Sequence, residues 1–471
     1  MADLHTLGAA ELLALYRSGA ASPVDVARAT LDHIARWEPH LQALYAFEPE
    51  RVLQQAQASE ARWRAGTAGA LDGVPCTIKE NIATAGTPVP GGTAATVLVP
   101  AAADAPPAAR LREAGAVLLA KTTMPDWGML SSGLSTFHPL TRNPWHLASN
   151  PGGSSAGAGA AAAAGYGPLH IGTDIGGSIR LPAAWCGVVG LKPSNGRVPI
   201  HPPYAGRAAG PMTRTVTDAA LMMQVLAQPD ARDTMSLPHQ AIAWTALDID
   251  LKGLRLGLQL DAGWGLPVEP AVQATIEAAA RRFEAAGAIV TPLPAFCTRV
   301  MADGMDHFWR MRSWLDFSAL PPERQDRVLP YIRQWIAAGA RLSGPEVFRG
   351  YSAMGLLREA AVAAIAPFDF VLSPVSPNTR FPAQWASPIN DPERPFEHIA
   401  FTLPYNMSEQ PAISVDAGRS PDGAPIGLQI AGRRHDDLGV LRLARAWEQL
   451  RDPQPTWPEP PASSSTPASA A

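Results

Sequence analysis

The sequence predicts an α/β protein with a single large domain, in which helices cover both faces of a central mixed β-sheet. Short apolar strands alternate with amphipathic helices along the 471 residues, a pattern typical of parallel strand pairing. The composition, 46% hydrophobic and 17% charged, suits a soluble chain with a large core. Because no change of composition marks a linker, we expect one domain over residues 1–451.

Composition and charge exclude several classes of protein. A net charge of −4 gives no reason to expect nucleic acid or an anionic membrane as a partner. Cys76, Cys186 and Cys297 are too few and too far apart for a disulfide framework or a metal cluster, so we expect no metal and no cofactor. The N-terminus does not resemble a signal peptide, and no apolar run reaches about 20 residues, so we expect a cytoplasmic protein.

Three helices are predicted before the first strong strand. Residues 8–18 are amphipathic, Ser22 and Pro23 form a helix start that leads to about Trp37, and a third helix covers 49–64. Their apolar residues recur at helical spacing, so we expect these helices to pack as cover over the sheet.

A buried strand is predicted at 74–78, directly before Lys79. A lysine at the end of a strand usually points to water, so position alone favours a surface role for Lys79. A helix and then a strand follow within 105–121. The loop at 131–145 contains His138, which we expect to be solvated rather than catalytic.

The central stretch, residues 150–193, contains two Gly-Gly-Ser steps. In the first step, Ser154 and Ser155 are candidate N-caps for a helix over 156–164, which Gly165 ends. This helix contains only alanine and glycine, so it can lie very close to its neighbours and should be buried.

A short buried strand at 169–172 leads to the second step, at 176–178. A tight glycine turn at the end of a strand can direct several backbone N–H groups at one point, as an oxyanion requires. Ser178 at its tip is well placed to be a nucleophile. From spacing alone, a helix cap for Ser154 and a loop hydroxyl for Ser178 are equally good interpretations.

The rest of the chain continues the alternation. Further strands are predicted at 254–258, 288–291 and 368–374, and further helices at 217–226, 270–286 and 436–450. Residues 296–350 carry Trp309, Trp314 and Trp335, whose spacing fits equally well a packed core and a helical cap over a pocket. Residues 452–471 are rich in Pro, Ser and Ala, so we predict a disordered tail.

Together these motifs resemble the amidase signature family of serine hydrolases. The family pattern runs GGSSGGS…GTDxGGSIRxPAxxCGxxGxKP, and residues 152–157 and 172–193 are similar to it almost position by position. Residues 71–80 resemble the LxGVPxxIKD element, with Glu80 where the family usually has Asp. Similarity extends to 121–126, 210–220, 404–415 and 426–432. The resemblance implies the amidase signature fold, with a core motif at about 71–220 and a variable cap at about 296–350.

The resemblance also implies a reaction and the residues that perform it. Ser178 would attack a carboxamide carbonyl, Lys79 would be its base if burial keeps the amine neutral, and Ser154 would relay the proton. The Gly153–Ser154 peptide bond would be cis. The oxyanion hole would consist of the backbone N–H groups of Ile175, Gly176, Gly177 and Ser178. A small-molecule amide would then yield a carboxylic acid and ammonia or an amine through an acyl-serine intermediate.

Two other interpretations compete with this one. Residues 153–157 fit the G-x-S-x-G nucleophile elbow, which would make Ser155 the nucleophile, but no strand directly precedes them. A nucleotide-binding protein would need G-x-x-x-x-G-K-[ST] after a strand, or G-x-G-x-x-G in the first βα turn, and the sequence has neither.

Within the family, the main alternative is the glutaminase subunit of a tRNA-dependent amidotransferase. In that branch, an Asp before the P-x-N element holds the amino group of the substrate. Alignment on Pro404 and Asn406 puts Ile399 at that position, which favours a stand-alone hydrolase. The sequence leaves open which amide is cleaved and whether the chain is a monomer or a homodimer.

Overall fold

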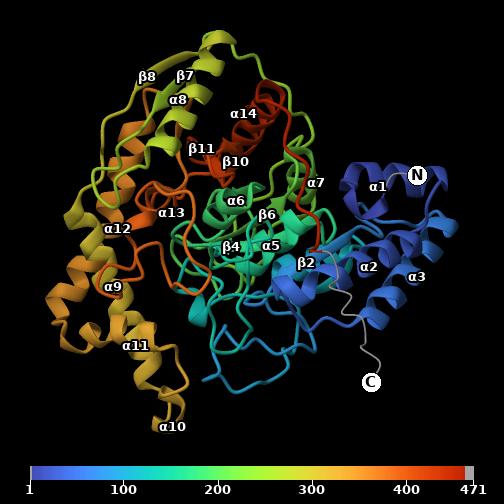
Figure 1. Cartoon of the computed structure of the whole chain (residues 1–471), viewed down its shortest axis with the longest axis horizontal. Coiled ribbons are helices and arrows are strands. Elements are labelled where there is room, and N and C mark those ends of the chain that lie inside the picture. Colours follow the sequence, from blue (N-terminus) through green and yellow to red (C-terminus); the bar gives the residue numbers. More distant parts are fainter. Residues whose placement is uncertain (1–2, 462–471) are drawn as a thin grey trace, which may run out of the picture.

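The computed structural model describes residues 3–461, and these contain one 11-stranded sheet. The strand order is β1-β3-β2-β4-β6-β5-β10-β11-β9-β7-β8. Strand β2 pairs in parallel with β3 and β4, and β7 pairs in parallel with β8 and β9. Antiparallel pairs connect these two groups through β6, β5, β10 and β11. The predicted central mixed sheet is confirmed (Figure 1).

The strands are β1 Leu44–Tyr45, β2 Pro75–Lys79, β3 Val117–Thr122, β4 Leu169–Asp174, β5 Val189–Lys192, β6 Ala208–Thr213, β7 Arg255–Leu258, β8 Ile289–Pro292, β9 Phe370–Pro374, β10 Ala412–Arg419 and β11 Pro425–Gly432. The α-helices are α1 Ala9–Ser18, α2 Pro23–Leu41, α3 Pro49–Ala65, α4 Pro106–Glu113, α5 Ala156–Ala164, α6 Arg180–Cys186, α7 Val216–Leu226, α8 Pro270–Ala285, α9 Arg299–Ser318, α10 Pro322–Gln325, α11 Pro330–Ala337, α12 Gly344–Ile365, α13 Leu403–Met407 and α14 Asp437–Leu450. Short 3-10 helices are η1 Leu4–Thr6, η2 Asp126–Gly128, η3 Ala338–Arg341 and η4 Glu397–Ile399.

Helices cover both faces of the sheet, as predicted. On one face, α1, α4, α7, α8 and α14 pack on a core that includes Ile78, Ile171 and Leu428. On the other face, α2, α3 and α5 pack against Val117 and Leu119 of β3, and α6 lies beside α5. Alternate side chains of a strand point to opposite faces, which is why two apolar clusters share one sheet.

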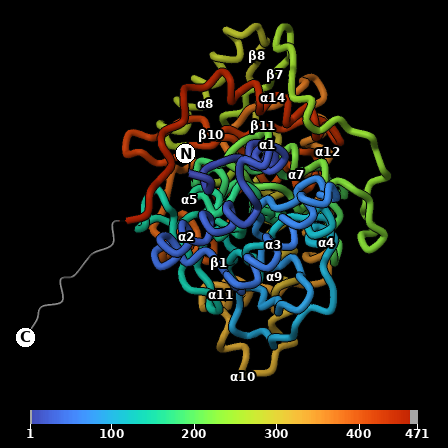
Figure 2. Tube along the Cα trace, turned by 90° about the vertical axis from the view of Figure 1, so that its right-hand side faces the viewer, coloured from blue at the N-terminus to red at the C-terminus, as the bar shows by residue number. Residues whose placement is uncertain are grey.

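Helices α9 to α12 form a separate group over residues 299–365, which we call the cap. Trp309 and Trp335 are buried in its core together with Ile399 and Leu403. Trp309 and Trp335 are therefore core residues of this helical group, whereas Trp314 is partly buried against it. Figure 1 shows the cap on the side opposite α1, α2 and α3. Figure 2, turned by 90°, shows α10 at the end of the molecule opposite β7 and β8.

Helix α5 is buried along its whole length, and Gly165 ends it in the left-handed conformation, with φ of 82°. Both predictions for this helix are confirmed. The predicted side-chain cap is wrong. Ser155 occupies the N-cap position but makes no capping hydrogen bond, because its hydroxyl is bonded to Lys79 and to the Thr173 carbonyl instead.

We expect Gly157→Ala in α5 to lower the free energy of unfolding by about 1–3 kcal/mol, because it overpacks a filled site. A Cβ atom on Gly157 would lie 2.3 Å from the Ala43 carbonyl oxygen and 2.5 Å from the Thr123 nitrogen. In the matched control Gly355→Ala, in α12, a Cβ atom would meet nothing within 4 Å. Urea unfolding measures both variants. A Gly157→Ala midpoint at or above that of the parent would contradict the close packing of α5.

Residues 452–461 carry no regular secondary structure. The Trp457 ring nevertheless lies 5.9 Å from the Trp145 ring and under the Arg214 guanidinium, because its large apolar surface can be buried there. The part of the tail prediction that falls on 462–471 lies outside the described residues.

Candidate active site

Elements far apart in the sequence meet at Lys79, the last residue of β2. Its side chain is buried, and Nζ donates hydrogen bonds to Ser154 Oγ at 2.8 Å and Ser155 Oγ at 3.0 Å. A third hydrogen bond reaches the Thr173 carbonyl at 3.3 Å, since parallel pairing brings β4 beside β2. The surface role that position alone favours for Lys79 is wrong.

Burial is the largest influence on the Lys79 amine, and it lowers the pKa to about 7. The negative charges of Asp174 and Glu80 oppose this shift, and the positive charge of Arg207 adds to it. Burial acts by penalising the ammonium form, which loses its hydration. A pKa of about 7 means that the amine can lose its third proton near neutral pH, and the uncharged amine can then accept a proton.

The Gly153–Ser154 peptide bond is cis, so this prediction is confirmed. Gly153 packs so closely against the preceding loop that a Cβ atom would lie 2.5 Å from the Ser132 nitrogen. The first Gly-Gly-Ser step thus directs two consecutive hydroxyls, those of Ser154 and Ser155, at the Lys79 amine.

Ser178 lies in the turn between β4 and α6, with 9% of its surface exposed. Its carbonyl accepts the Ser155 N–H at 3.1 Å, which ties the two Gly-Gly-Ser steps together. Within residues 3–461, the Ser178 hydroxyl makes no hydrogen bond to Ser154. The structure therefore joins Ser154 to Lys79 but leaves the Ser178 hydroxyl at the pocket wall. Contacts between a nucleophile and its base are often long before substrate binds.

Asp174 braces the turn that carries Ser178. Its carboxylate accepts the Gly177 and Ile179 N–H groups at 2.7 and 3.1 Å and pairs with Arg180 at 3.0 Å. Burial would raise the pKa of Asp174, but the Arg180 charge and hydrogen bonds from Arg180 and Asn406 outweigh it and hold the pKa well below its usual range. The lowered pKa of Asp174 favours its carboxylate form, which holds the turn through these hydrogen bonds.

The hydrogen bonds of Asp174 also decide which of the four predicted oxyanion donors are available. The Gly177 N–H is already bonded to Asp174. Within the described part of the chain, the N–H groups of Ile175, Gly176 and Ser178 have no acceptor. Three of the four predicted donors are therefore unoccupied, and Gly177 serves the turn instead.

Glu80, which stands where the family usually has Asp, holds a loop. Its carboxylate accepts the Gly91 and Gly92 N–H groups, both at 2.7 Å, and pairs with His138 Nε2 at 2.9 Å. His138 is buried, so the prediction that it is solvated is wrong. The Glu80 carboxylate explains its burial, because it satisfies the ring nitrogen that water would otherwise solvate.

A pocket opens beside Ser178. Its lining residues are Gly128, Met129, Leu130, Ser131, Ile175, Gly176, Ser178, Trp309, Arg312, Phe396 and Ile399. The cap contributes Trp309 and Arg312, so the region at 296–350 does shape the pocket. Ile399, where the glutaminase branch would have an Asp, is part of the same wall.

The comparison with known families identifies the family of this chain. The model of the Amidase family matches residues 25–441. The chain belongs to the amidase signature family. It is therefore an amidase-family hydrolase that acts on amides.

Individual relatives of the enzyme carry two kinds of name. An acylamidase of Rhodococcus erythropolis is 34% identical over 469 residues, covering 95% of this chain and 96% of its own. One of the subunits of the glutamyl-tRNA(Gln) amidotransferase of Myxococcus xanthus is also 34% identical, over 480 residues, covering 96% and 98%. Among solved structures, a bacterial aryl acylamidase has a TM-score of 0.85 at 31% identity and covers 95% of this chain and 96% of its own. Sequence identity alone does not separate these two activities.

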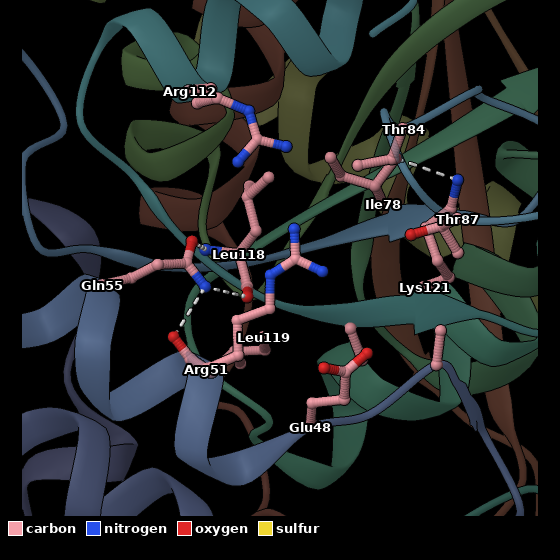
Figure 3. A pocket seen from close by; sticks show the side chains of 12 residues that line it. Glu48, Arg51, Gln55, Ile78, Thr84, Thr87, Arg112, Leu118, Leu119 and Lys121 are labelled. Carbon is pink, nitrogen blue, oxygen red and sulfur yellow. Dashed lines mark hydrogen bonds between the residues drawn. The ribbon is translucent and has the colours of Figure 1, made fainter. Parts of the chain in front are cut away.

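The enzyme has another pocket between α3, β2 and β3 (Figure 3). The Lys121 ammonium there donates to Thr84 Oγ1 at 3.0 Å and to the Ile82 carbonyl, and Arg112 pairs with Asp104 at 2.8 Å. These cations are already partnered within the protein, which indicates a structural role.

The described chain offers neither a metal site nor a membrane span. Residues 3–461 contain no group of three or more His, Cys, Asp or Glu side chains able to hold a metal ion. No helix within that range is both long enough and apolar enough to cross a bilayer.

Sequence reasoning misses the residues that support the site rather than those within it. Asp174 and Arg180 stand inside the motif GTDIGGSIR, and two charges in an otherwise buried stretch are a signal for an internal ion pair. For Ser155 the sequence suggests only a cap or a rival nucleophile, because its bond to Lys79 depends on the strand pairing.

Proposed function

We propose that the enzyme is a stand-alone amide hydrolase in which Ser178 is the nucleophile, Lys79 the base and Ser154 the proton relay. The observation that carries the proposal is the 2.8 Å contact of Lys79 Nζ with Ser154 Oγ, deep in the protein and next to a pocket that Ser178 lines. A serine hydroxyl is a weak nucleophile and needs such a base.

In the proposed reaction, Ser178 Oγ attacks the amide carbonyl while its proton passes through Ser154 to Lys79. The N–H groups of Ile175, Gly176 and Ser178 stabilise the oxyanion that forms. The C–N bond then breaks, and the proton returns from Lys79 to the departing amine. Water attacks the acyl-serine in the same way and releases the acid.

The pocket favours an amide with an apolar or aromatic body. Trp309, Phe396 and Ile399 form an apolar wall beside Ser178. Such walls bind substrates by burying apolar surface. The relatives named acylamidase and aryl acylamidase are consistent with this substrate class.

The second candidate is the glutaminase subunit of an amidotransferase, which the equally similar Myxococcus relative favours. The α-ammonium of glutamine would need an acidic partner. Ile399 offers none, and the described lining of the pocket contains no carboxylate. Next to apolar walls, the ammonium of glutamine would lose its hydration without gaining an acidic partner, and this loss would weaken the binding of glutamine.

A hydrolysis screen with the purified chain separates the two candidates. Aliphatic, aryl and amino-acid amides, with glutamine among them, are compared by release of amine or ammonia. The proposal predicts hydrolysis of apolar amides and little of glutamine. Glutamine as the best substrate would overturn it in favour of the glutaminase.

The proposed base also predicts the pH dependence of the reaction. Protonated Lys79 cannot accept the Ser178 proton, so kcat/KM should fall as pH drops through the lowered pKa of about 7 and reach a plateau above it. The slope below it should approach about tenfold per pH unit. Circular dichroism over the same range checks that the chain stays folded. A rate that does not change between acidic and alkaline pH would contradict the neutral-lysine mechanism.

A further inference from the structure

Arg312 differs from every other residue of the Ser178 pocket. Of the described residues that line this pocket, it alone carries a charge. Its guanidinium carbon lies 4.5 Å from the centre of the Tyr204 ring, so the side chain is stacked on an aromatic face. Stacking holds a guanidinium in place while leaving its N–H edge open.

Within residues 3–461, Arg312 takes part in no ion pair and donates no hydrogen bond. The other two arginines of α9 are partnered. Arg299 pairs with Glu397 at 2.7 Å, and Arg310 pairs with Asp306 at 2.7 Å. An acid on η4 and an acid on α9 therefore pair with these two arginines, whereas Arg312 at the pocket has no counter-charge within the described residues.

A second arginine, Arg207, adds positive charge next to Arg312. Burial lowers the pKa of Arg207, and the charge of Arg312 lowers it further, because the two guanidinium groups lie close enough to repel each other. Arg207 donates to the Pro202 carbonyl and, in the part of the chain that the structure describes, has no acidic partner. The hydroxyl of Tyr204, whose ring Arg312 stacks on, is buried and, in that same part, has no hydrogen-bond partner.

We propose that the preferred substrates carry a carboxylate, which Arg312 binds with Arg207 beside it; this rests on the function proposed above. The two oxygens of a carboxylate match the N–H edge of a guanidinium, and the anion would relieve the repulsion between the two arginines. The apolar wall binds the body of the same molecule. The substrate class is therefore an apolar amide with a carboxylate and without a neighbouring ammonium.

The test measures kcat/KM of the full-length protein on two matched pairs of amides. In the first pair, 3-acetamidobenzoate and 3-methylacetanilide, the carboxylate is on the amine side. In the second pair, N-phenylsuccinamate and N-phenylbutanamide, it is on the acyl side. A hydrogen-bonded charge pair predicts a preference of about tenfold to a hundredfold for the anionic member of one pair. The pair that shows the preference identifies the side of the scissile bond on which Arg312 lies.

Arg312→Met should abolish this preference, so that the anionic and the neutral member of the pair give equal kcat/KM, because Met keeps the apolar stem and loses the charge. Arg207→Met should weaken the preference for the anionic member without abolishing it. The matched control is Arg341→Met, since Arg341 is an exposed arginine of the same cap that does not line the pocket. Labelling by a fluorophosphonate reports for each variant whether the Ser178 site is intact.

Neutral amides hydrolysed with no preference for the anion in either pair would overturn the carboxylate site and leave the proposed function standing. A preference that survives both Arg312→Met and Arg207→Met would overturn the assignment to these arginines. Failure of all four amides together with failure of labelling would instead contradict the proposed function.

Discussion

Replacing Ser178 by alanine is expected to lower kcat by about 10⁴-fold or more, because the change removes the only atom that forms the acyl intermediate. The protein should remain folded. Within the described residues, the Ser178 hydroxyl has no hydrogen-bond partner, so its loss leaves no buried group unsatisfied. Steady-state hydrolysis of an apolar anilide measures the rate, and mass spectrometry after fluorophosphonate treatment identifies the labelled residue.

Ser414→Ala is the matched control for this variant. Ser414 lies on β10, is fully buried and also has a hydroxyl without a partner in the described range. The control should keep the parent rate and the parent label. Ser178→Ala activity within about tenfold of the parent, or a label on another serine in the parent, would show that Ser178 is not the nucleophile.

The place of Ser178 could be predicted because local chemistry determines it. A buried strand must end before a tight turn, and Gly177 adopts φ of 128°, which side chains rarely allow. The same holds for α5, where a run of alanine and glycine is followed by Gly165. Motifs of this kind depend on residues only a few positions apart, so they can be recognised from the sequence alone.

The supporting contacts could not be predicted, because they join residues that only tertiary packing brings together. Asn406 donates to Asp174 across 232 positions of the chain, and Glu80 pairs with His138 across 58. No local pattern encodes such a pair. Arg312 lies in the cap, where the sequence is least similar to the family pattern, so neither motif nor resemblance points to it.

The role of Lys79 as the base gives the second prediction with a large expected effect. Lys79→Met should lower kcat by about 10² to 10⁴-fold, the range that a general base contributes. Methionine has a similar length and no charge to bury, so we expect the variant to fold. The residual rate should also lose its dependence on pH near 7, because the group whose pKa burial lowers to about 7 is then absent. Hydrolysis rates across pH measure both effects.

Two further variants distinguish a base from a merely structural lysine. Lys79→Arg should fail to rescue the rate, because a guanidinium stays charged at all accessible pH values and cannot accept the Ser178 proton. Lys121→Met removes another buried lysine, whose pKa burial lowers to about 8, but whose bonds to Ile82 and Thr84 lie outside the Ser178 pocket. It should lower stability and leave kcat within about tenfold. Near-parent rates for Lys79→Met at neutral pH would mean that Ser178 is activated by some other group.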